Sequence, residues 1–315
     1  MHSSTRLAGL GLIAVLAAAC SGAGASATPA APTDAPATEA PSAPASVAPA
    51  SPDACAKESL AVVNPGLLTI GTDNPAFPPY FEFSDAPTPP WELGDPTTGG
   101  GFEGAFAYAL AEQLGFAEAE VQWTVVPFNN AFAPGPKEFD IDINQVSFTP
   151  ERAANVDMSD GYYFVNQSVV AAQDSPVAAA TSIADLKAFR FGAQVGTTSF
   201  DTIETVIAPT TETSVYDTND AAIEALKVGQ IDAVVVDLPT AFFITAVQFE
   251  DGTIVGQFES PAGDDAEHFS VVLNKDSPLT PCVNQALAEM KDDGTLDLIT
   301  QEWLSDKADA PVFQP

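Results

Sequence analysis

Apolar and polar residues alternate along the chain in two patterns from about residue 56 to residue 315. Short apolar or β-branched runs, bounded by Gly, Pro or Asp, predict buried strands. We expect strands at 67–72, 121–127, 140–146, 189–195, 215–216, 231–237 and 269–273. The segments between them carry helix-terminus signals, such as Thr149 before Pro150 at a start and a glycine at several ends. We expect helices at 105–114, 150–156, 200–207, 220–228, 238–248, 279–292 and 296–304. This alternation predicts the α/β class, with mainly parallel sheets in one or two units.

The first 19 residues have a different pattern. A positively charged start containing Arg6 is followed by an unbroken run of apolar or small residues from Leu7 to Ala19. This run is too short to cross about 30 Å of hydrocarbon as a helix, but it suits the apolar part of a signal peptide. Cys20 then precedes Ser21 and Gly22, an arrangement that resembles a bacterial lipoprotein signal. We predict a signal peptide at 1–19 and a lipid on Cys20; the alternative is an ordinary cleaved signal with a spare cysteine.

Residues 21–52 consist almost wholly of Ala, Pro, Ser and Thr. Such a segment has too little apolar bulk to offset the entropy of ordering, and its prolines favour extended polyproline II. We therefore predict a tether at 20–54 that lifts a folded domain away from the membrane. The predicted location is outside the cytoplasm, on the outer face of the cell membrane, held there by lipid.

The chain carries 43 Asp and Glu against 10 Lys and Arg, for a net charge of -33. This excess of anions repels phosphate backbones and anionic headgroups, and it argues against nucleic-acid binding. The 46% apolar content is enough for hydrophobic cores, so the chain is not a wholly disordered acidic protein. Because basic residues are so scarce, any base at a predicted site stands out.

Three cysteines occur in the chain. If Cys20 carries lipid, Cys55 and Cys282 remain as a pair in an oxidising compartment, which favours a disulfide. The alternative is two buried free thiols.

Enzyme motifs are mostly missing. The sequence has no Walker loop, HExxH, GxSxG or paired CxxC, and His268 is the single histidine after the signal. The letters of 99–104, GGGFEG, fit GxGxxG, but a loop and not a strand precedes them, so we reject a dinucleotide site. We predict no catalytic residue, no metal site and no cofactor.

Arg152 is the most informative base. It lies in the first turn of a predicted helix, where the helix dipole disfavours a cation, and free N–H groups beside it would make an anion site. The alternative is a salt bridge to an acid such as Glu151 or Asp157. Thr198, in a Gly-Thr-Thr-Ser turn after a strand, could also hold a carboxylate. Asp237 closes another strand, where ligands of open α/β sheets gather, although it could simply cap the next helix.

Six stretches between about residues 67 and 304 together resemble one known family, the amino-acid-type solute-binding proteins of bacterial ABC importers. In chain order they are LTIGTDNPAFPPYFEF from 67, GFEGAFAYALAEQLG from 101, FDIDINQVSFTPERAANVDMSDGYY from 139, SIADLKAFRFGAQVGTTS from 182, AIEALKVGQIDAVVVDLPTA from 222 and LAEMKDDGTLDLITQEWL from 287. The resemblance implies the two-lobed type II periplasmic-binding fold. Each lobe then has a central, mainly parallel sheet flanked by helices, and two crossover strands near 169–172 and 269–271 join the lobes.

The resemblance also implies a domain layout and a set of ligand-binding residues. Lobe 1 would comprise 55–170 and 271–315, and lobe 2 would comprise 171–270; a bridge between Cys55 and Cys282 would staple the discontinuous lobe. In this family's pattern an arginine binds the ligand's α-carboxylate, two hydroxyls donate to the same group, an acid accepts from the α-ammonium, and an acid and an aromatic ring lie in the first loop. The matching residues are Arg152, Ser147, Thr198, Asp237, Asp73 and Phe77, with Gln145 and the Val146 backbone lining the pocket.

The implied function is capture of a free amino acid by a monomer and delivery to a membrane permease. The sequence departs from the family pattern near the expected ligand mouth, at 74–76, in a Pro/Gly-rich insertion at 84–100, at Gly104 and Ala105, and at Asn144 and Gln145. An acidic ligand side chain would need a second base, for which Lys137 is the nearby candidate, so we favour a polar neutral or cationic amino acid. The alternatives are a dehydratase on the same fold, with Glu82 or Glu103 as its acid or base, and a lipid-anchored sensory domain.

Overall fold

The computed structural model describes residues 54–260, 263, 266–304 and 310–315. The chain divides into two units, residues 1–46 and 47–315, and all described residues belong to the second unit. The predicted signal peptide, the lipid site at Cys20 and all of the tether except residue 54 lie outside the described residues.

The first of two sheets has the strand order β2-β1-β3-β10-β4. β1 pairs in parallel with both β2 and β3, while β10 is antiparallel to both β3 and β4. Four strands therefore run in one direction and β10 runs in the other. The strands are β1 (Leu68–Thr72), β2 (Val121–Val125), β3 (Ile141–Asp142), β4 (Asp157–Phe164) and β10 (His268–Leu273).

The second sheet repeats this plan in the order β7-β6-β8-β5-β9. β6 is parallel to β7 and β8, and β5 is the reversed strand between β8 and β9. Its strands are β5 (Gln167–Ala172), β6 (Phe191–Gln194), β7 (Ser214–Tyr216), β8 (Ala233–Asp237) and β9 (Gly252–Gln257). The predicted two-lobed α/β fold is confirmed, with mixed sheets in which one strand of five is reversed.

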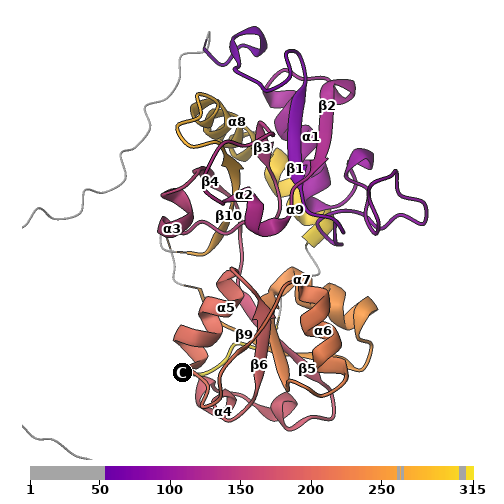
Figure 1. Ribbon diagram of the computed structural model, residues 1–315, viewed down its shortest axis with the longest axis vertical. Coiled ribbons are helices and arrows are strands. Elements are labelled where there is room, and N and C mark those ends of the chain that lie inside the picture. Colours follow the sequence, from indigo (N-terminus) through magenta and orange to yellow (C-terminus); the bar gives the residue numbers. More distant parts are fainter. Residues whose placement is uncertain (1–53, 261–262, 264–265, 305–309) are drawn as a thin grey trace, which may run out of the picture. The chain divides into compact units, whose positions relative to one another are not determined.

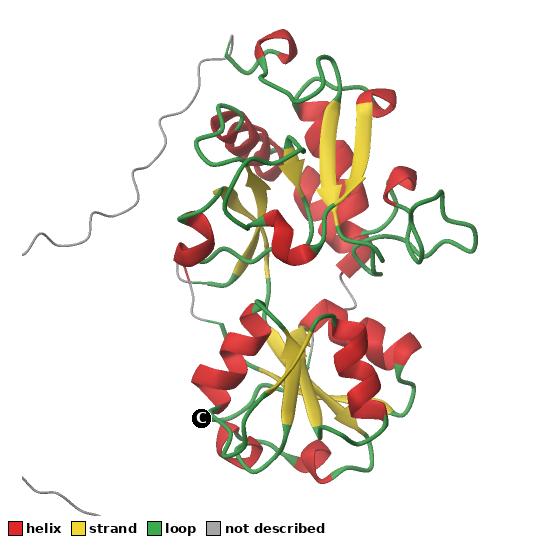
Figure 2. Cartoon of the chain, viewed as in Figure 1, coloured by secondary structure: helices red, strands yellow, loops and turns green. Residues whose placement is uncertain are grey.

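Helices flank each sheet, as Figures 1 and 2 show. Those of the first lobe are α1 (Phe102–Gln113), α2 (Phe128–Ala131), α3 (Pro150–Ala153), α8 (Thr280–Asp292) and α9 (Thr295–Leu304). Those of the second lobe are α4 (Ile183–Leu186), α5 (Thr198–Thr202), α6 (Asn219–Lys227) and α7 (Leu238–Phe243). Five-residue π-helical segments, Ile203–Ile207 and Ile244–Gln248, continue α5 and α7.

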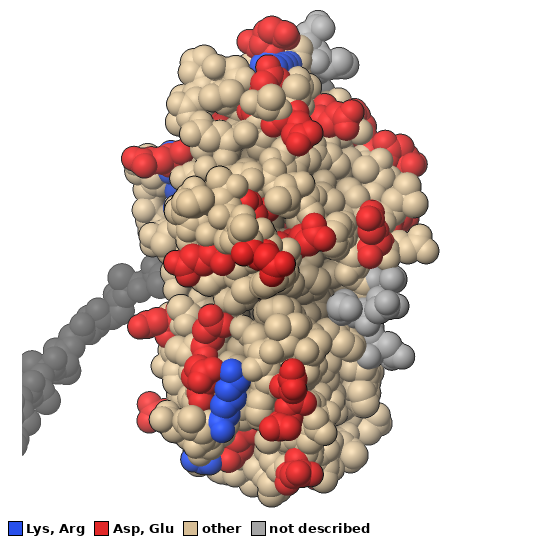
Figure 3. Space-filling model, turned by 90° about the vertical axis from the view of Figure 1, so that its right-hand side faces the viewer, with Lys and Arg blue, Asp and Glu red and all other residues tan. Residues whose placement is uncertain are grey.

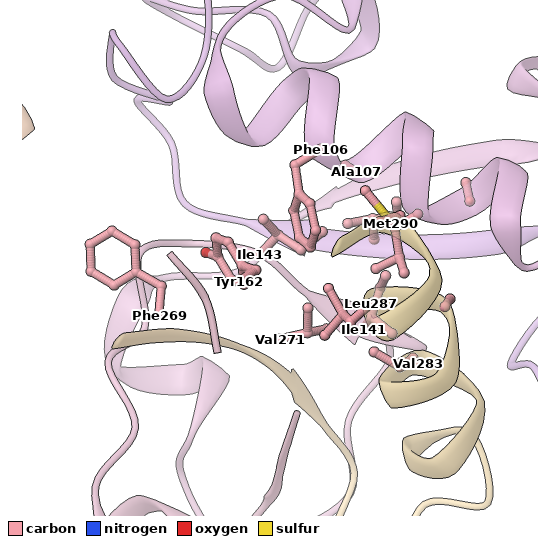
Figure 4. Packing of buried hydrophobic residues seen from close by; sticks show 14 of the residues in the cluster. Phe106, Ala107, Ile141, Ile143, Tyr162, Phe269, Val271, Val283, Leu287 and Met290 are labelled. Carbon is pink, nitrogen blue, oxygen red and sulfur yellow. The ribbon is translucent and has the colours of Figure 1, made fainter. Parts of the chain in front are cut away.

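Apolar side chains from both faces of the second sheet are buried. Val169 and Val235 belong to a core cluster on one face, while Val170 and Val234 belong to a cluster on the other. Strands covered on both faces need apolar residues at successive positions, which explains the unbroken apolar run of β8. In the first lobe, the ring of Phe106 from α1 stacks on that of Tyr162 from β4 with centroids 4.4 Å apart (Figure 4).

Both connections between the lobes lie a few residues closer to the N-terminus than the resemblance implied. The residues 169–172 lie within β5 and 269–271 within β10, whereas the connecting segments are 165–166, between β4 and β5, and 258–267, between β9 and β10. The predicted lobe boundaries at 170 and 271 therefore fall inside strands. The last residues also need correction, because Phe313 packs into a second-lobe core cluster and Val312 bridges to Gln257 of β9. No local signal marks these boundaries, since strand pairing and long-range packing place them.

Three strands and two helices were not predicted as such. The strands β4, β5 and β9 contain polar residues or glycines that interrupt the apolar pattern, and β5 carried no strand prediction beyond the crossover assigned to 169–172. The helices α2 and α4 are four residues long, which is too short to show a helical period.

Cys55 and Cys282 form the predicted disulfide, with Cα atoms 5.3 Å apart. The bond ties the start of the described chain to α8, so it closes the first lobe between its two sequence segments. No helix within the described residues has the length and apolar character needed to span a membrane.

Candidate functional site

A cavity lies between the lobes. Residues at the strand ends of both sheets, and in the loops and helices that follow those strands, line it. From the first lobe its lining includes Thr72, Asp73, Pro75, Ala76, Phe77, Phe81, Phe128, Asn144, Gln145 and Arg152. From the second lobe it includes Gln194, Thr197, Thr198, Ser199, Asn219, Val236, Asp237 and Thr240. Most of these residues follow the carboxyl ends of parallel strands, where ligands of open α/β sheets bind.

Arg152 is held in this cavity by a short helix. The hydroxyl of Thr149 caps α3 by accepting from the Arg152 backbone N–H. The guanidinium donates to the Ser147 carbonyl at 2.5 Å and, across the cleft, to the Gly196 carbonyl at 2.8 Å. Its central carbon also lies over the ring of Phe132, 4.4 Å from the ring centroid, where a cation is attracted by the ring face.

The Arg152 side chain is a buried cation with 6% exposure. The salt-bridge alternative does not hold, because no carboxylate among the described residues lies within 4.0 Å of the guanidinium, and Asp157 pairs instead with Lys275 at 3.6 Å. Burial lowers the pKa of Arg152, although nearby acids, Glu267 foremost, act in the opposite direction. A buried guanidinium that bonds only carbonyls still has N–H groups to donate, and an anion matches them. The basis for the anion site is thus the arginine itself and not the dipole of α3, which is a single turn long.

Acidic side chains are spread over both lobes on the face drawn in Figure 3, where bases are few. Because the whole chain carries a net charge of -33, the anion site at the inward-facing Arg152 does not arise from a general positive potential at the surface.

Asp237 closes β8 and lies at the N-cap position of α7, but its side chain makes no capping hydrogen bond. Its Oδ1 accepts from Nε2 of Gln167 at 2.7 Å. Burial and, after it, the nearby Glu267 carboxylate raise the pKa of Asp237 to about 8, against the smaller opposing effect of the Gln167 hydrogen bond. The capping alternative is therefore excluded, and this acid is available to the cavity.

The first loop places an acid and a ring at the cavity. The Asp73 carboxylate accepts from the backbone N–H groups of Asn74, at 2.7 Å, and Phe128, at 3.2 Å. Burial raises the pKa of Asp73 above its usual value. The Phe77 ring lies 6.3 Å from the ring of Phe243 in the second lobe, measured between centroids.

Gln145 adopts a left-handed backbone, with φ 49°. Glu103 holds it there, because the Glu103 carboxylate accepts from both the backbone N–H and the side-chain amide of Gln145, and also from the Tyr162 hydroxyl. Burial raises the pKa of Glu103 to about 7 despite these hydrogen bonds. Positive φ at a non-glycine residue costs energy and needs such support from its surroundings.

Two of the predicted ligand residues do not line the cavity. The Val146 side chain is buried in an apolar cluster, and its carbonyl accepts from the Ser270 N–H. The Ser147 hydroxyl donates to Oε1 of Glu267 at 2.7 Å. Thr198 does line the cavity, and its Oγ1 lies 3.4 Å from the Ser147 Oγ.

Several cavity residues were not predicted as site residues. Gln194 is the last residue of β6, and Asn219 and Thr240 lie in the first turns of α6 and α7, positions that a stricter search of strand ends would have found. Buried Thr72 Oγ1 and Asn144 Nδ2 have no hydrogen-bond partner among the described residues, so the lining has groups left for a ligand. No local signal marks Gln167, at the start of β5, or Glu267, at the end of the second connecting segment, although Gln167 contacts both Asp237 and Glu267.

The insertion at 84–100 folds back onto the first loop. The Asn74 side-chain amide donates to the Pro90 carbonyl at 2.9 Å, and its oxygen accepts from the Glu92 N–H at 3.2 Å. Lys137 lies elsewhere, donating to the carbonyls of Asn130 and Ala133. Arg152 is consequently the sole base in the cavity lining among the described residues.

No group of three or more potential metal ligands occurs within the described residues. His268 begins β10, and its ring stacks on that of Phe148. The residues at the cavity therefore supply one cation, two acids, neutral hydrogen-bonding groups and aromatic surface.

Comparisons with known proteins agree with this geometry. The chain is similar to the arginine-binding extracellular protein ArtP of Bacillus subtilis (strain 168), 29% identical over 210 residues that cover 65% of this chain and 78% of ArtP. It is similar to the L-cystine-binding protein TcyJ of Escherichia coli (strain K12), 29% identical over 218 residues that cover 68% and 78% of the two chains. Among solved structures, an ancestral arginine-binding protein bound to glutamine matches with a TM-score of 0.61 and 29% identity, covering 76% of this chain and 97% of that one.

A family model matches residues 83–306, which is more than half of the chain. The matched residues include every strand except β1 and run from before α1 to the end of α9. They therefore include the elements that position Arg152 and Asp237. The chain belongs to the bacterial extracellular solute-binding proteins of family 3.

Proposed function

We propose that this protein captures a free α-amino acid between its two lobes and delivers it to the membrane permease of an ABC importer. The observation that carries the proposal is the buried Arg152 guanidinium, which has no carboxylate partner among the described residues and lines a cavity shared with Asp237. An α-amino acid carries a carboxylate for the first group and an ammonium for the second. Charge-assisted hydrogen bonds of this kind fix a ligand's orientation.

The rest of the lining supports a polar neutral or cationic ligand side chain. Asp73 is the acid at the first loop, and the neutral groups of Thr72, Asn144 and Asn219 can donate or accept. An acidic side chain would face Asp73 without a second base to pair with. The two relatives are named for arginine and cystine, and the similar solved structure is bound to glutamine. Each of these amino acids has a polar neutral or a cationic side chain.

Contacts across the cleft support capture by lobe closure. Arg152 of the first lobe donates to Gly196 of the second, and the Thr240 hydroxyl lies 3.3 Å from the Tyr80 hydroxyl. A ligand that bonds both lobes adds to these contacts and shifts the population toward the closed form. A permease that prefers this form then receives loaded protein.

An enzyme on this fold is less well supported. It would need an acid or base in contact with the ligand beyond the groups that hold it. Among the described residues Glu103 is committed to Gln145 and Tyr162, and neither Glu103 nor Glu82 lines the cavity.

Membership of this extracellular family agrees with export, and we extend the proposal to a lipid on Cys20 that keeps the protein at the outer face of the membrane. The mass of the N-terminal peptide tests this: an unmodified Cys20 would contradict it.

Titration calorimetry of the purified full-length protein with the standard amino acids tests the main proposal. At least one polar neutral or cationic amino acid should bind at a one-to-one ratio, while its α-carboxamide and its des-amino analogue bind much more weakly. Arg152→Ala should lose about 2–5 kcal/mol of binding free energy, because the ligand carboxylate loses its charged partner in a desolvated site.

Arg190→Ala is the matched control, since Arg190 pairs with Asp232 on the surface and does not line the cavity. Its affinity should equal that of the wild type. Equal affinity for the amino acid and its carboxamide, or unchanged affinity in Arg152→Ala, would contradict the assignment of Arg152. Conversion of the ligand to a product would favour the enzyme.

A further inference from the structure

Two carboxylates from distant parts of the chain meet at one amide beside the cavity. Nε2 of Gln167 lies 2.7 Å from Asp237 Oδ1 and 3.0 Å from Glu267 Oε1. Gln167 is the first residue of β5, directly after one segment that connects the lobes, and Glu267 is the last residue of the other, directly before β10. The Gln167 oxygen is also engaged, because it accepts from the Ser199 hydroxyl at 2.7 Å.

No Lys or Arg among the described residues forms a salt bridge with Asp237 or Glu267. Since both oxygens bind one nitrogen, they lie within about 6 Å of each other, a separation at which like charges in a poorly solvated site strongly oppose joint ionisation. The amide can neutralise neither charge.

Other titratable groups face Asp237 from several elements. Arg152 from α3 favours its ionised form, whereas Glu267 and, more weakly, Glu103 from α1 disfavour that form. Two phenols, those of Tyr80 and Tyr163, are near enough to be affected by Asp237, and the pKa of each is raised. His268 follows Glu267 in the chain and turns its Nδ1 to the Ala266 carbonyl. Burial is the largest influence, and together these groups raise the pKa of Asp237 to about 8.

We propose that Asp237 carries a proton in the ligand-free protein at neutral pH, and that binding of the amino acid releases this proton. The proposal rests on the proposed function, because it assigns the ligand's ammonium to Asp237. In this step the carboxyl O–H bond of Asp237 breaks, the proton passes to the solvent, and the carboxylate accepts a hydrogen bond from the ammonium. The incoming positive charge replaces the proton as the partner of the Asp237–Glu267 pair.

Proton release makes the affinity depend on pH in a defined direction. Below the pKa of Asp237 in the free protein the ligand competes with a bound proton, so the dissociation constant falls as pH rises, by up to about tenfold per pH unit. Above that pKa the dependence disappears. Glu267 acts as a positioning residue, since its charge keeps the proton on Asp237 without contacting the ligand.

Calorimetry in buffers with different heats of ionisation measures the protons released per ligand bound. Near neutral pH the wild type should release close to one proton per amino acid, and the number should fall toward zero above about pH 8. Glu267→Gln keeps the shape of the side chain but removes the charge. It should still bind, release fewer protons at neutral pH, and reach its pH-independent affinity at a lower pH.

Glu259→Gln provides the matched control, because Glu259 is an exposed acid on the same connecting segment. Its proton release should equal that of the wild type. Binding without proton release, or release that Glu267→Gln leaves unchanged, would overturn the proposal while leaving the proposed function intact. Failure of every amino acid to bind would instead reject the proposed function.

Discussion

Asp142 is an acidic residue buried among apolar neighbours. Its side chain is fully buried on β3, and both carboxyl oxygens lack a hydrogen-bond partner among the described residues. It pairs with Val272 of β10 and shares its face of the sheet with an apolar cluster that includes Phe139. A Cβ atom on Gly71 would lie 2.6 Å from Asp142 Oδ2, so the glycine makes room for the carboxyl group.

Burial raises the pKa of Asp142 well above its usual value, and the neighbouring acids Glu103 and Asp73 add to the effect, while Lys137 opposes it. The folded protein therefore keeps the proton on Asp142 to a higher pH than the unfolded chain does. Such a group favours folding at low pH and does so less as pH rises toward its folded pKa.

We predict that Asp142→Asn removes this pH dependence. Between about pH 5 and about pH 8 the melting temperature of the wild type should fall relative to that of the variant, because the variant has no proton to lose. Calorimetric melting curves of both proteins across this range measure the difference. Melting temperatures that changed in parallel in the two proteins would contradict a buried proton on Asp142.

At the scale of elements, the turn between β6 and α5 is shaped by Gly196. Its φ of 77° lies in the left-handed region, and its carbonyl accepts from Arg152. A Cβ atom there would lie 2.4 Å from the Asn129 side-chain oxygen in the opposite lobe. The left-handed turn thus favours a glycine, and a larger residue would also have to displace the end of the Asn129 side chain.

Gly196→Ala should weaken amino-acid binding by up to about tenfold, because the methyl group is strained at this φ and displaces the Asn129 side chain, which together move the carbonyl that accepts from Arg152. The double variant with Asn129→Ala should regain part of the loss. Gly229→Ala is the control, since Gly229 has φ 73° at the end of α6 but open space around it. That variant should lose stability and keep its affinity; equal affinity losses in both glycine variants would contradict the steric explanation.

At the scale of the whole molecule, the first lobe depends on segments far apart in the chain. β10, α8 and α9 complete a lobe that begins with β1, and the Cys55–Cys282 bond links the two parts across 227 residues. A bond that closes so long a loop restricts the unfolded chain and stabilises the fold by about 2–5 kcal/mol.

Replacing both cysteines with alanine should lower the melting temperature without changing affinity, because neither residue lines the cavity. Differential scanning calorimetry of the wild type with and without reductant should show the same decrease. The double variant serves as the control, since reductant should leave its melting temperature unchanged. A wild type insensitive to complete reduction would contradict a stabilising role for the bond.

The sequence alone determined the features that local patterns specify. The alternation of apolar runs and helix-terminus signals predicted the α/β class, and the scarcity of bases singled out Arg152. The resemblance across six stretches predicted the two lobes. The strands β4, β5 and β9 were not predicted, because their residues are stabilised by neighbours in the sheet more than by their own pattern.

Only the tertiary structure decided which side chains contact one another at the site. It brings Gln167 and Glu267, 100 residues apart, to Asp237, leaves Arg152 without an acidic partner among the described residues, and turns Ser147 toward Glu267 instead of the cavity. The sequence shows which residue types are present that can bind an amino acid. Burial and pairing set their charge and direction, and both depend on contacts between residues that no local pattern connects.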